Sequence, residues 1–449
     1  MKTISSLILL TILLASCAPV VVPASATATL TPAQPATLTP FPTATPAPTP
    51  TPVTYIEGLD HIPIPDSAFI DEIVSGNYLR VMGLTREQVT LVYIKQGVFV
   101  VMLDQTTDTP LAVYVDGAWQ NISLKFLGKQ AGISIGSDTV GDPTPEDIAI
   151  IADRNFVMMS DFSEWRRTEP QPGQIELDQT AQMVIYKDRL NKLGITEYYA
   201  SAAIYQMFWP DWLMTGDYSQ QQLREFMQRR IQYMIDNNSD ASALEVVNEP
   251  YLEGNPEHMQ DIFYKKWGNS YDYISEAFQM ARDYSRANRK NIRLFFNEND
   301  NHYPIGLTSQ NSRKIVSMLK QKGLIDFVGM QMHVGEWRKG AFDELMVPGI
   351  QVELDFYQKL GVPVEFTEVT YKPSDEELKL SEDVFNVRLA HVYEMILKIA
   401  LERNITSIVF WGVSDRHFPE TGNFHLFDVN GQPRLAYYTV LKTLFEAIK

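Results

Sequence analysis

From residue 120 to residue 449 the sequence alternates short apolar runs, rich in β-forming residues, with longer segments of helical periodicity. The eight apolar runs are 132–135, 156–159, 198–204, 244–248, 293–296, 327–333, 362–367 and 408–411. The clearest helical segments are 220–237, 259–288, 312–322, 350–360, 381–403 and 436–448. Strands that alternate with helices in this way form parallel βαβ units, and eight such units favour an α/β fold closed as a (β/α)8 TIM barrel over an open doubly wound sheet.

Two of the apolar runs end in a glutamate. Glu249 follows Asn248 at the end of the fourth run, and Glu368 follows Thr367 at the end of the seventh. Catalytic residues of such barrels lie where the strands end, and strands four and seven lie across the mouth from each other. Retaining glycoside hydrolysis needs two carboxyl groups about 5–5.5 Å apart. One such glutamate alone is usually only solvated, but the pair indicates this chemistry.

Several further segments carry motifs around this pair. They are 124–136, 164–173, 246–249, 329–333, 366–368, 410–415 and 426–430, the last followed by Ala436-Tyr437. In this order they resemble the family-10 glycoside hydrolases, best known as endo-β-1,4-xylanases. Each segment alone is weak, because Asn-Glu-Pro recurs in related barrel hydrolases, but the shared order is specific.

The resemblance implies catalytic roles that agree with the chemistry of the glutamate pair. Glu249 is implied to protonate the leaving glycosidic oxygen and then to activate water as a base. Glu368 is implied to attack the anomeric carbon and form a glycosyl-enzyme. Asn248 is implied to hydrogen-bond the sugar 2-hydroxyl, a contact that strengthens in the transition state.

Two further motifs supply supporting residues. His333, with Gln331 beside it, is implied to hydrogen-bond the nucleophile and hold it ionised. A lone histidine on a strand is usually a core residue, but the fit of His333 to the motif favours function. Trp411 is implied to stack on the sugar at the cleavage point, although a tryptophan that ends a barrel strand often belongs to the core.

The sugar-binding positions depart from the family pattern. At positions where typical members carry polar side chains that contact sugar, this chain has Ser160, Asp161, Glu164, Ser201 and Phe208. The aspartate that follows the nucleophile by two residues in the family is Thr370 here. The position of the family's second strand-eight tryptophan falls at or beside Phe418-Pro419. We expect Asp161, Ser201 and Tyr205, together with Trp411, to bind substrate.

The lost contacts predict a change of specificity. Each lost buried hydrogen bond typically costs about 1–3 kcal/mol. We therefore predict weak or absent activity on unsubstituted xylan and a preference for a differently shaped or more apolar glycone. Alternatively, shifted loops bring other residues, such as Gln206 or Arg166, into these contacts.

Three other functions compete with this interpretation. A related barrel hydrolase could use the same two glutamates on a β-glucan, mannan or galactan. A surface lipoprotein could bind glycan without catalysis, although the presence of both glutamates, Asn248 and His333 argues against it. A metal-dependent hydrolase is disfavoured, because the seven histidines show no metal-ligand spacing. We expect neither a metal nor a cofactor, and the glycines of 132–137 lack a dinucleotide-binding spacing.

The amino-terminal region predicts export. Residues 1–17 combine a lysine, a short apolar run and Leu14-Ala15-Ser16-Cys17, which resembles a bacterial lipobox. Cys17 is the only cysteine, and it stands where lipidation requires one. Residues 18–54 hold ten of the 26 prolines and no charged residue, so they form an extended spacer. We expect a protein anchored by lipid at Cys17 on the outer face of a bacterial membrane.

Residues 55–119 form a separate β-rich region before the predicted barrel at 120–449. Three β-rich runs are followed by the turn Asp116-Gly117 and Trp119. This region is either a small sheet that serves as a structural extension or, less favoured, a site that binds polysaccharide through Tyr114 or Trp119. The net charge of −17 argues against nucleic acid as a partner.

We expect the protein to be a monomer. Its expected partners are β-linked polysaccharides or oligosaccharides, and it is expected to meet a membrane only through the lipid on Cys17.

Overall fold

A computed structural model describes residues 88–93, 100–104, 110–115, 118–139, 143–160, 162–250, 262–335, 346–417 and 424–448. The predicted signal and spacer segments, Cys17, Asp161 and Phe418-Pro419 lie outside this set. No helix in these ranges is long and apolar enough to cross a membrane.

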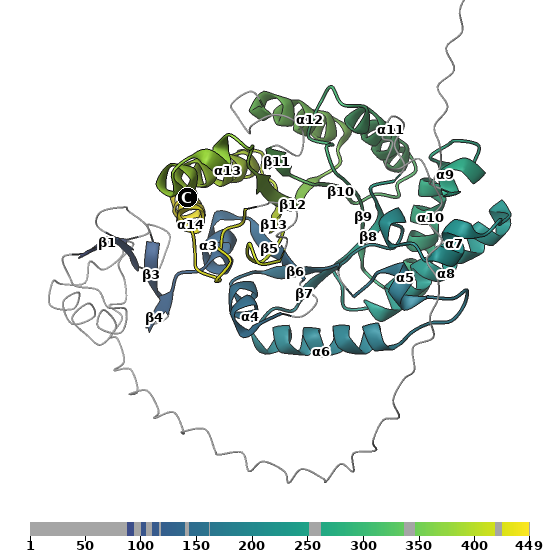
Figure 1. Ribbon diagram of the computed structural model, residues 1–449, viewed down its shortest axis with the longest axis horizontal. Helices are drawn as coiled ribbons and strands as arrows, with labels where there is room; N and C mark the ends of the chain where they lie inside the picture. The colour runs from purple at the N-terminus through teal and green to yellow at the C-terminus, as the bar shows by residue number, and fades with distance from the viewer. Residues whose placement is uncertain are drawn as a thin grey trace, which may run out of the picture. The chain divides into compact units, whose positions relative to one another are not determined.

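Eight parallel strands close into a barrel, as predicted (Figure 1). In chain order they are β5 (Ser134–Asp138), β6 (Phe156–Met159), β7 (Glu197–Ala200), β8 (Ala243–Asn248), β9 (Arg293–Glu298), β10 (Phe327–Met330), β12 (Val364–Lys372) and β13 (Ser407–Phe410). Neighbours in sequence pair in parallel, β10 pairs with β12, and β13 pairs with β5, so the sheet has no free edge. The short strand β11 (His333–Gly335) pairs with the far end of β12, which splits the predicted run 327–333 into two strands.

Helices surround the barrel (Figure 1). The longer ones are α3 (Leu124–Ala131), α4 (Pro145–Ala152), α6 (Asp178–Lys192), α8 (Gln220–Asn237), α10 (Asp272–Ala287), α11 (Leu307–Gln321), α12 (Met346–Leu360), α13 (Glu382–Glu402) and α14 (Leu435–Glu446). The short ones are α5 (Trp165–Thr168), α7 (Asp211–Thr215) and α9 (Ile262–Lys266), with 3₁₀ turns η2 (Gln206–Phe208) and η5 (Glu377–Lys379).

One predicted helix is wrong in its extent. The segment 259–288 was expected to be continuous, but α9 ends at Lys266 and α10 begins at Asp272. Gly268 and Asn269 between them have φ angles of 72° and 59°. This left-handed conformation ends a helix and is typical of glycine and asparagine. Two such residues in succession were the signal for the break.

The inward-facing residues of the strands change from apolar to polar along the barrel. Tyr199, Phe295 and Phe327 belong to a buried cluster in the barrel interior, where the rings of Phe295 and Phe327 stack with centroids 4.5 Å apart. Side chains on a strand alternate between faces. Two residues further along β9, the inward-facing residue is Asn297. The apolar cluster therefore fills the barrel beneath a polar layer at the carboxyl ends of the strands.

The expected small β-rich extension is present as a four-stranded antiparallel sheet. Its strands are β1 (Val89–Tyr93), β2 (Val100–Asp104), β3 (Pro110–Val115) and β4 (Ala118–Asn121), paired in that order. Val115 pairs with Ala118 across the predicted turn at 116–117. The domain boundaries and the choice between a structural and a glycan-binding role remain predictions.

Candidate active site

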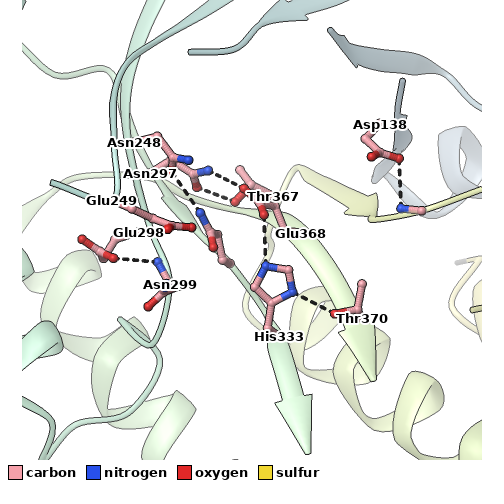
Figure 2. Close-up of polar contacts among 12 residues, drawn as sticks. Asp138, Asn248, Glu249, Asn297, Glu298, Asn299, His333, Thr367, Glu368 and Thr370 are labelled. Carbon is pink, nitrogen blue, oxygen red and sulfur yellow. Dashed lines mark hydrogen bonds and ion pairs between the residues drawn. The ribbon is translucent and has the colours of Figure 1, made fainter. Parts of the chain in front are cut away.

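Both predicted catalytic glutamates lie at the carboxyl end of the barrel. Glu249 directly follows β8, and Glu368 lies on β12; Figure 2 shows their side chains with those of Asn297 and His333. The backbone of Glu249 is in the left-handed region, with φ of 39°, and its N–H donates to Asn297 O at 3.1 Å. A glutamate in this conformation carries a backbone strain of about 1–3 kcal/mol.

A β-bulge accompanies each glutamate: one precedes Glu249, and the other contains Glu368. Along β8, Glu245 pairs with Phe295 but Val247 already pairs with Phe296, so β8 has one residue more than β9. Bulges change which face a side chain occupies, and they are common next to active sites. The shift on β8 turns the side chain of Asn248 into the barrel mouth.

The second bulge lies on β12. Phe366 pairs with Ile408 and Val369 with Phe410, so β12 also gains one residue, relative to β13. As a result two consecutive side chains point inward, since Thr367 donates to Asn297 Oδ1 at 2.6 Å and Asn297 donates to Glu368 Oε1 at 2.8 Å. A regular strand would turn one of these two side chains outward.

Glu368 is held on both oxygens. Asn297 Nδ2 binds Oε1, and His333 Nε2 lies 3.0 Å from Oε2. The other ring nitrogen of His333, Nδ1, lies 2.8 Å from Thr370 Oγ1. Because His333 pairs with Thr370 in the β11–β12 ladder, the backbone register itself places the ring between the threonine and the glutamate.

Glu249 has a different set of partners. The hydroxyl of Tyr205 donates to Glu249 Oε2 at 3.1 Å. Burial raises the pKa of the Glu249 carboxyl above its usual value, while hydrogen bonds, the strongest from Gln331, oppose that rise. Gln331 Nε2 also donates to Asn248 Oδ1 at 3.0 Å, so Gln331 supports Asn248 and Glu249.

A third carboxyl group lies beneath the pair. Glu245 is fully buried and accepts a short hydrogen bond from Ser201 Oγ. Burial raises the pKa of Glu245 well above its ordinary value, and the charges of Glu368 and Glu249 raise it further. Burial and the charge of Glu249 likewise raise the pKa of Glu368. The mutual repulsion of these charges disfavours full ionisation of the cluster.

Sequence reasoning missed two members of this site. Asn297 follows the apolar run 293–296 and begins the polar segment Asn297-Glu298-Asn299-Asp300, which was an available signal. Glu245 lies inside a run that was interpreted as an apolar strand. Gly329 makes room for Asn297, because a Cβ at position 329 would collide with Asn297 Oδ1.

The structure describes three of the four predicted substrate-binding residues. The hydroxyls of Ser201 and Tyr205 are donated to Glu245 and Glu249. The side chain of Trp411 is half-buried against the apolar cluster in the barrel, and the backbone N–H of this residue donates to Val369 O. Asp161 falls outside the described residues. Within the described ranges, no group of three or more His, Cys, Asp or Glu side chains has a metal-binding arrangement.

A closed parallel barrel with a half-buried glutamate directly after β8 and a buried glutamate on β12 defines the class of (β/α)8-barrel glycosyl hydrolases. Residues 123–443 match the model of glycosyl hydrolase family 10, and the chain belongs to that family. The predicted fold class and the predicted enzyme class, a glycosyl hydrolase, are both confirmed.

Comparisons with individual proteins agree. The chain is 28% identical over 262 residues to endo-1,4-beta-xylanase A of Caldicellulosiruptor saccharolyticus, covering 52% of this chain and 71% of that protein. It is 25% identical over 345 residues to endo-1,4-beta-xylanase 2 of Aureobasidium pullulans, covering 73% and 88%. Xylanase 10B of Thermotoga petrophila, solved with xylobiose, matches with a TM-score of 0.65 and 20% identity over 74% of this chain and all of that one. This structural likeness concerns the fold.

Proposed function

We propose that the protein is a retaining glycoside hydrolase that cleaves a β-1,4-linked, xylan-like plant polysaccharide by double displacement. The observation that carries the proposal is the asymmetric environment of the two glutamates. Glu368 receives an amide hydrogen bond on one oxygen and lies 3.0 Å from the imidazole of His333, which can carry a positive charge, on the other. The donors to Glu249, among them the phenol of Tyr205 and the amide of Gln331, are neutral. A positively charged imidazole favours the ionised form of a carboxyl, so Glu368 is the group suited to be the anion and Glu249 the group suited to hold the proton.

In the first step Glu368 attacks the anomeric carbon as the glycosidic bond breaks. Glu249 transfers its proton to the departing oxygen, which leaves as a neutral hydroxyl. Asn248 Oδ1 is occupied by Gln331, so its Nδ2 is the group that donates to the sugar 2-hydroxyl.

In the second step Glu249, now ionised, takes a proton from water. The water oxygen bonds to the anomeric carbon as the bond to Glu368 breaks, which restores both carboxyl groups. Two displacements at one carbon retain its configuration. NMR of the first-formed anomer tests this step, and an inverted product would refute the assignment.

We further propose an altered glycone specificity. At two positions where typical members bind sugar, the polar groups are bonded to the protein. Glu164 pairs with Arg166 and Arg167 at 2.7 and 3.1 Å. Ser201 donates to Glu245. These pairings also occupy Arg166, one of the residues that could have replaced the lost contacts.

The test is turnover by the purified protein on an aryl β-xyloside and on a panel of β-glucan, mannan, galactan and xylan fragments. A kcat/KM on linear xylooligosaccharides within about tenfold of ordinary enzyme values, 10⁴–10⁸ M⁻¹s⁻¹, would show that specificity is unchanged. Activity on another β-glycan alone would favour a related hydrolase. Glycan binding without any turnover would favour a non-catalytic binder.

The proposed location is the outer face of a bacterial membrane, through lipid on Cys17. The proposal is supported by the lipobox-like Leu14-Ala15-Ser16-Cys17 and the proline-rich spacer after it. Mass spectrometry of the mature amino terminus tests it, and an unmodified start downstream of Cys17 would refute it.

A further inference from the structure

Tyr205 lies beside Glu249 because of backbone pairing. Its neighbour Ile204 donates to Val246 O at 3.0 Å and accepts from the N–H of Asn248 at 2.9 Å. Ile204 thus forms a parallel bridge with Val247, so the chain after β7 runs alongside the end of β8. Tyr205 follows the bridge on one segment, and Glu249 lies two residues beyond it on the other. The register, rather than chance side-chain flexibility, brings the phenol to the carboxyl.

The preceding backbone is held from below by a buried arginine. Arg230 is 1% exposed and donates to the carbonyl oxygens of Ala202 and Ala203, each at 3.1 Å, and to Thr168 Oγ1 at 2.9 Å. A buried cation without a carboxylate partner is costly, and here backbone carbonyls from the segment leading to Tyr205 satisfy it.

The ring of Tyr205 is braced as well. Phe208 packs edge-on against it, with ring centroids 4.7 Å apart, and the guanidinium of Arg166 covers Phe208 at 5.7 Å. Edge-to-face aromatic pairs of this kind fix the orientation of both rings. The hydroxyl therefore points at a defined oxygen, Oε2 of Glu249, at 3.1 Å.

We propose that Tyr205 is a positioning residue of the acid/base glutamate: its hydroxyl occupies Oε2 of Glu249 and thereby assigns the transferable proton to Oε1. The inference rests on the proposed role of Glu249 and replaces the expectation that Tyr205 binds sugar through its hydroxyl. It also gives the Ala-Ile-Tyr segment after β7 a role in catalysis.

The phenol acts as a donor in both steps of the reaction. Burial and the charges of Glu249 and Glu368 raise the pKa of Tyr205 well above its ordinary value, so the hydroxyl keeps its proton. It therefore stabilises the anion that forms when Glu249 gives up its proton. Loss of this donor should raise the pKa of Glu249, because hydrogen bonds to the ionised form lower it.

The test is Tyr205→Phe, which removes one oxygen and keeps the ring that Phe208 contacts. Because a hydrogen bond to a charged group stabilises the charged form, its loss should raise the pKa of Glu249 by about 1 unit. The alkaline limb of the kcat/KM profile should move to higher pH by the same amount. A glycoside with a poor leaving group should lose about tenfold in kcat/KM at the optimum. A glycoside with a dinitrophenyl leaving group needs no acid and should change less than about threefold.

The matched control is Tyr284→Phe. Tyr284 also donates its hydroxyl to a carboxylate, Asp236 Oδ2 at 2.8 Å, but on the helices outside the barrel. It should leave the pH profile unchanged. Equal losses on both leaving groups in Tyr205→Phe, with an unshifted limb, would overturn the proposal and point to a sugar contact.

A direct titration separates this inference from the proposed function. Carbon-13 NMR of labelled glutamate carboxyls, assigned with Glu249→Gln, reports the pKa of Glu249 without any substrate. An upward shift in Tyr205→Phe supports the contact even if no glycoside is turned over. An unchanged pKa in a variant with the wild-type melting temperature refutes it even if the enzyme is active.

Discussion

Two glutamates three residues apart on β12, Glu365 and Glu368, are both buried, and their surroundings differ. Glu365 accepts hydrogen bonds from Tyr199 and Ser407 and forms an ion pair with Arg293. Glu368 is bound by an amide and an imidazole and lies close enough to Glu249 for the two charges to interact. The carboxylate of Glu365 is thus neutralised by a cation, whereas the carboxyl of Glu368 has another carboxyl group as its neighbour.

The difference separates a structural carboxylate from a catalytic one. A buried carboxylate with a cation and two hydroxyls has its charge and its hydrogen-bonding capacity satisfied by the protein. A buried carboxyl whose neighbours are other carboxyls must share protons with them, which is the condition for acid and nucleophile chemistry. Burial alone therefore does not identify a catalytic residue on this strand; the charge of its neighbours does.

The largest expected effect comes from exchanging each glutamate for glutamine. Glu368→Gln should lower kcat by about 10⁴- to 10⁶-fold, since the nucleophile is lost, and should not reduce stability. Glu365→Gln should keep activity within about threefold but lower the free energy of unfolding by about 1–3 kcal/mol, because Arg293 loses its partner. Steady-state kinetics and urea unfolding measure the two effects. The comparison fails if both variants lose activity alike.

The loss of activity in Glu249→Ala should depend on the leaving group of the substrate. Turnover of glycosides with poor leaving groups should fall by several orders of magnitude, because acid catalysis is lost, whereas the first step with an activated aryl glycoside should be spared. Azide should partly restore the second step by replacing the base-activated water. The same assay on Glu368→Ala is the control, since it should lose both steps. Equal loss on all substrates in Glu249→Ala would contradict its acid/base role.

Thr370→Val should have a smaller effect. The variant removes the hydroxyl that lies 2.8 Å from His333 Nδ1, so the ring that binds Glu368 is held from one side only. We expect a loss of about tenfold in kcat/KM, equivalent to about 1.4 kcal/mol. Thr443→Val is the matched control, because its buried hydroxyl donates to Thr439 O on α14. A change no larger than that of the control would remove Thr370 from the network.

The last effect concerns stability and not activity: it is the change in the free energy of unfolding as pH rises. The pKa of Glu245 is raised in the folded protein by burial. Its contribution to stability is therefore complete below the unfolded pKa of about 4.3 and is lost as pH rises through the folded value. Glu245→Gln should thus lose less stability than the parent between pH 5 and pH 8, by about 1.4 kcal/mol per unit of pKa shift.

Urea unfolding at the two pH values measures this slope. Glu197→Gln serves as the control, because Glu197 also accepts a serine hydroxyl, from Ser242 at 3.0 Å, at the opposite end of a strand. A slope for Glu245→Gln that equals the parent slope would mean that Glu245 is ionised throughout, and the proton-sharing cluster would then include only the catalytic pair.

The barrel could be predicted from sequence because each strand is short, apolar and separated from the next by helical periodicity. Glu249 and Glu368 could be predicted because they stand where such runs end. The segment 259–288 was predicted poorly, since helical periodicity continues on both sides of Gly268 and outweighed the break signal there.

The rest of the site depends on contacts between strands, which the pattern of apolar residues along the sequence does not predict. Asn297 reaches Glu368 only because β12 has a bulge and Gly329 lacks a side chain. Gln331 binds Asn248 across the barrel mouth, 83 positions away in sequence. Such partners follow from the register between strands, and a single chain shows only which residues are available.

The bulge on β12 has a consequence for what a single strand can supply to the site. The strand pairs with β13 before the extra residue, at Phe366, and after it, at Val369. The residues between these two pairs are Thr367 and Glu368, so a strand one residue shorter would present one of them and not both. Without Thr367, Asn297 would lose the hydroxyl that binds its Oδ1, and without Glu368 the carboxyl that Asn297 binds would be gone. The single extra residue thus lets one strand supply both the carboxyl and the group that orients its amide partner.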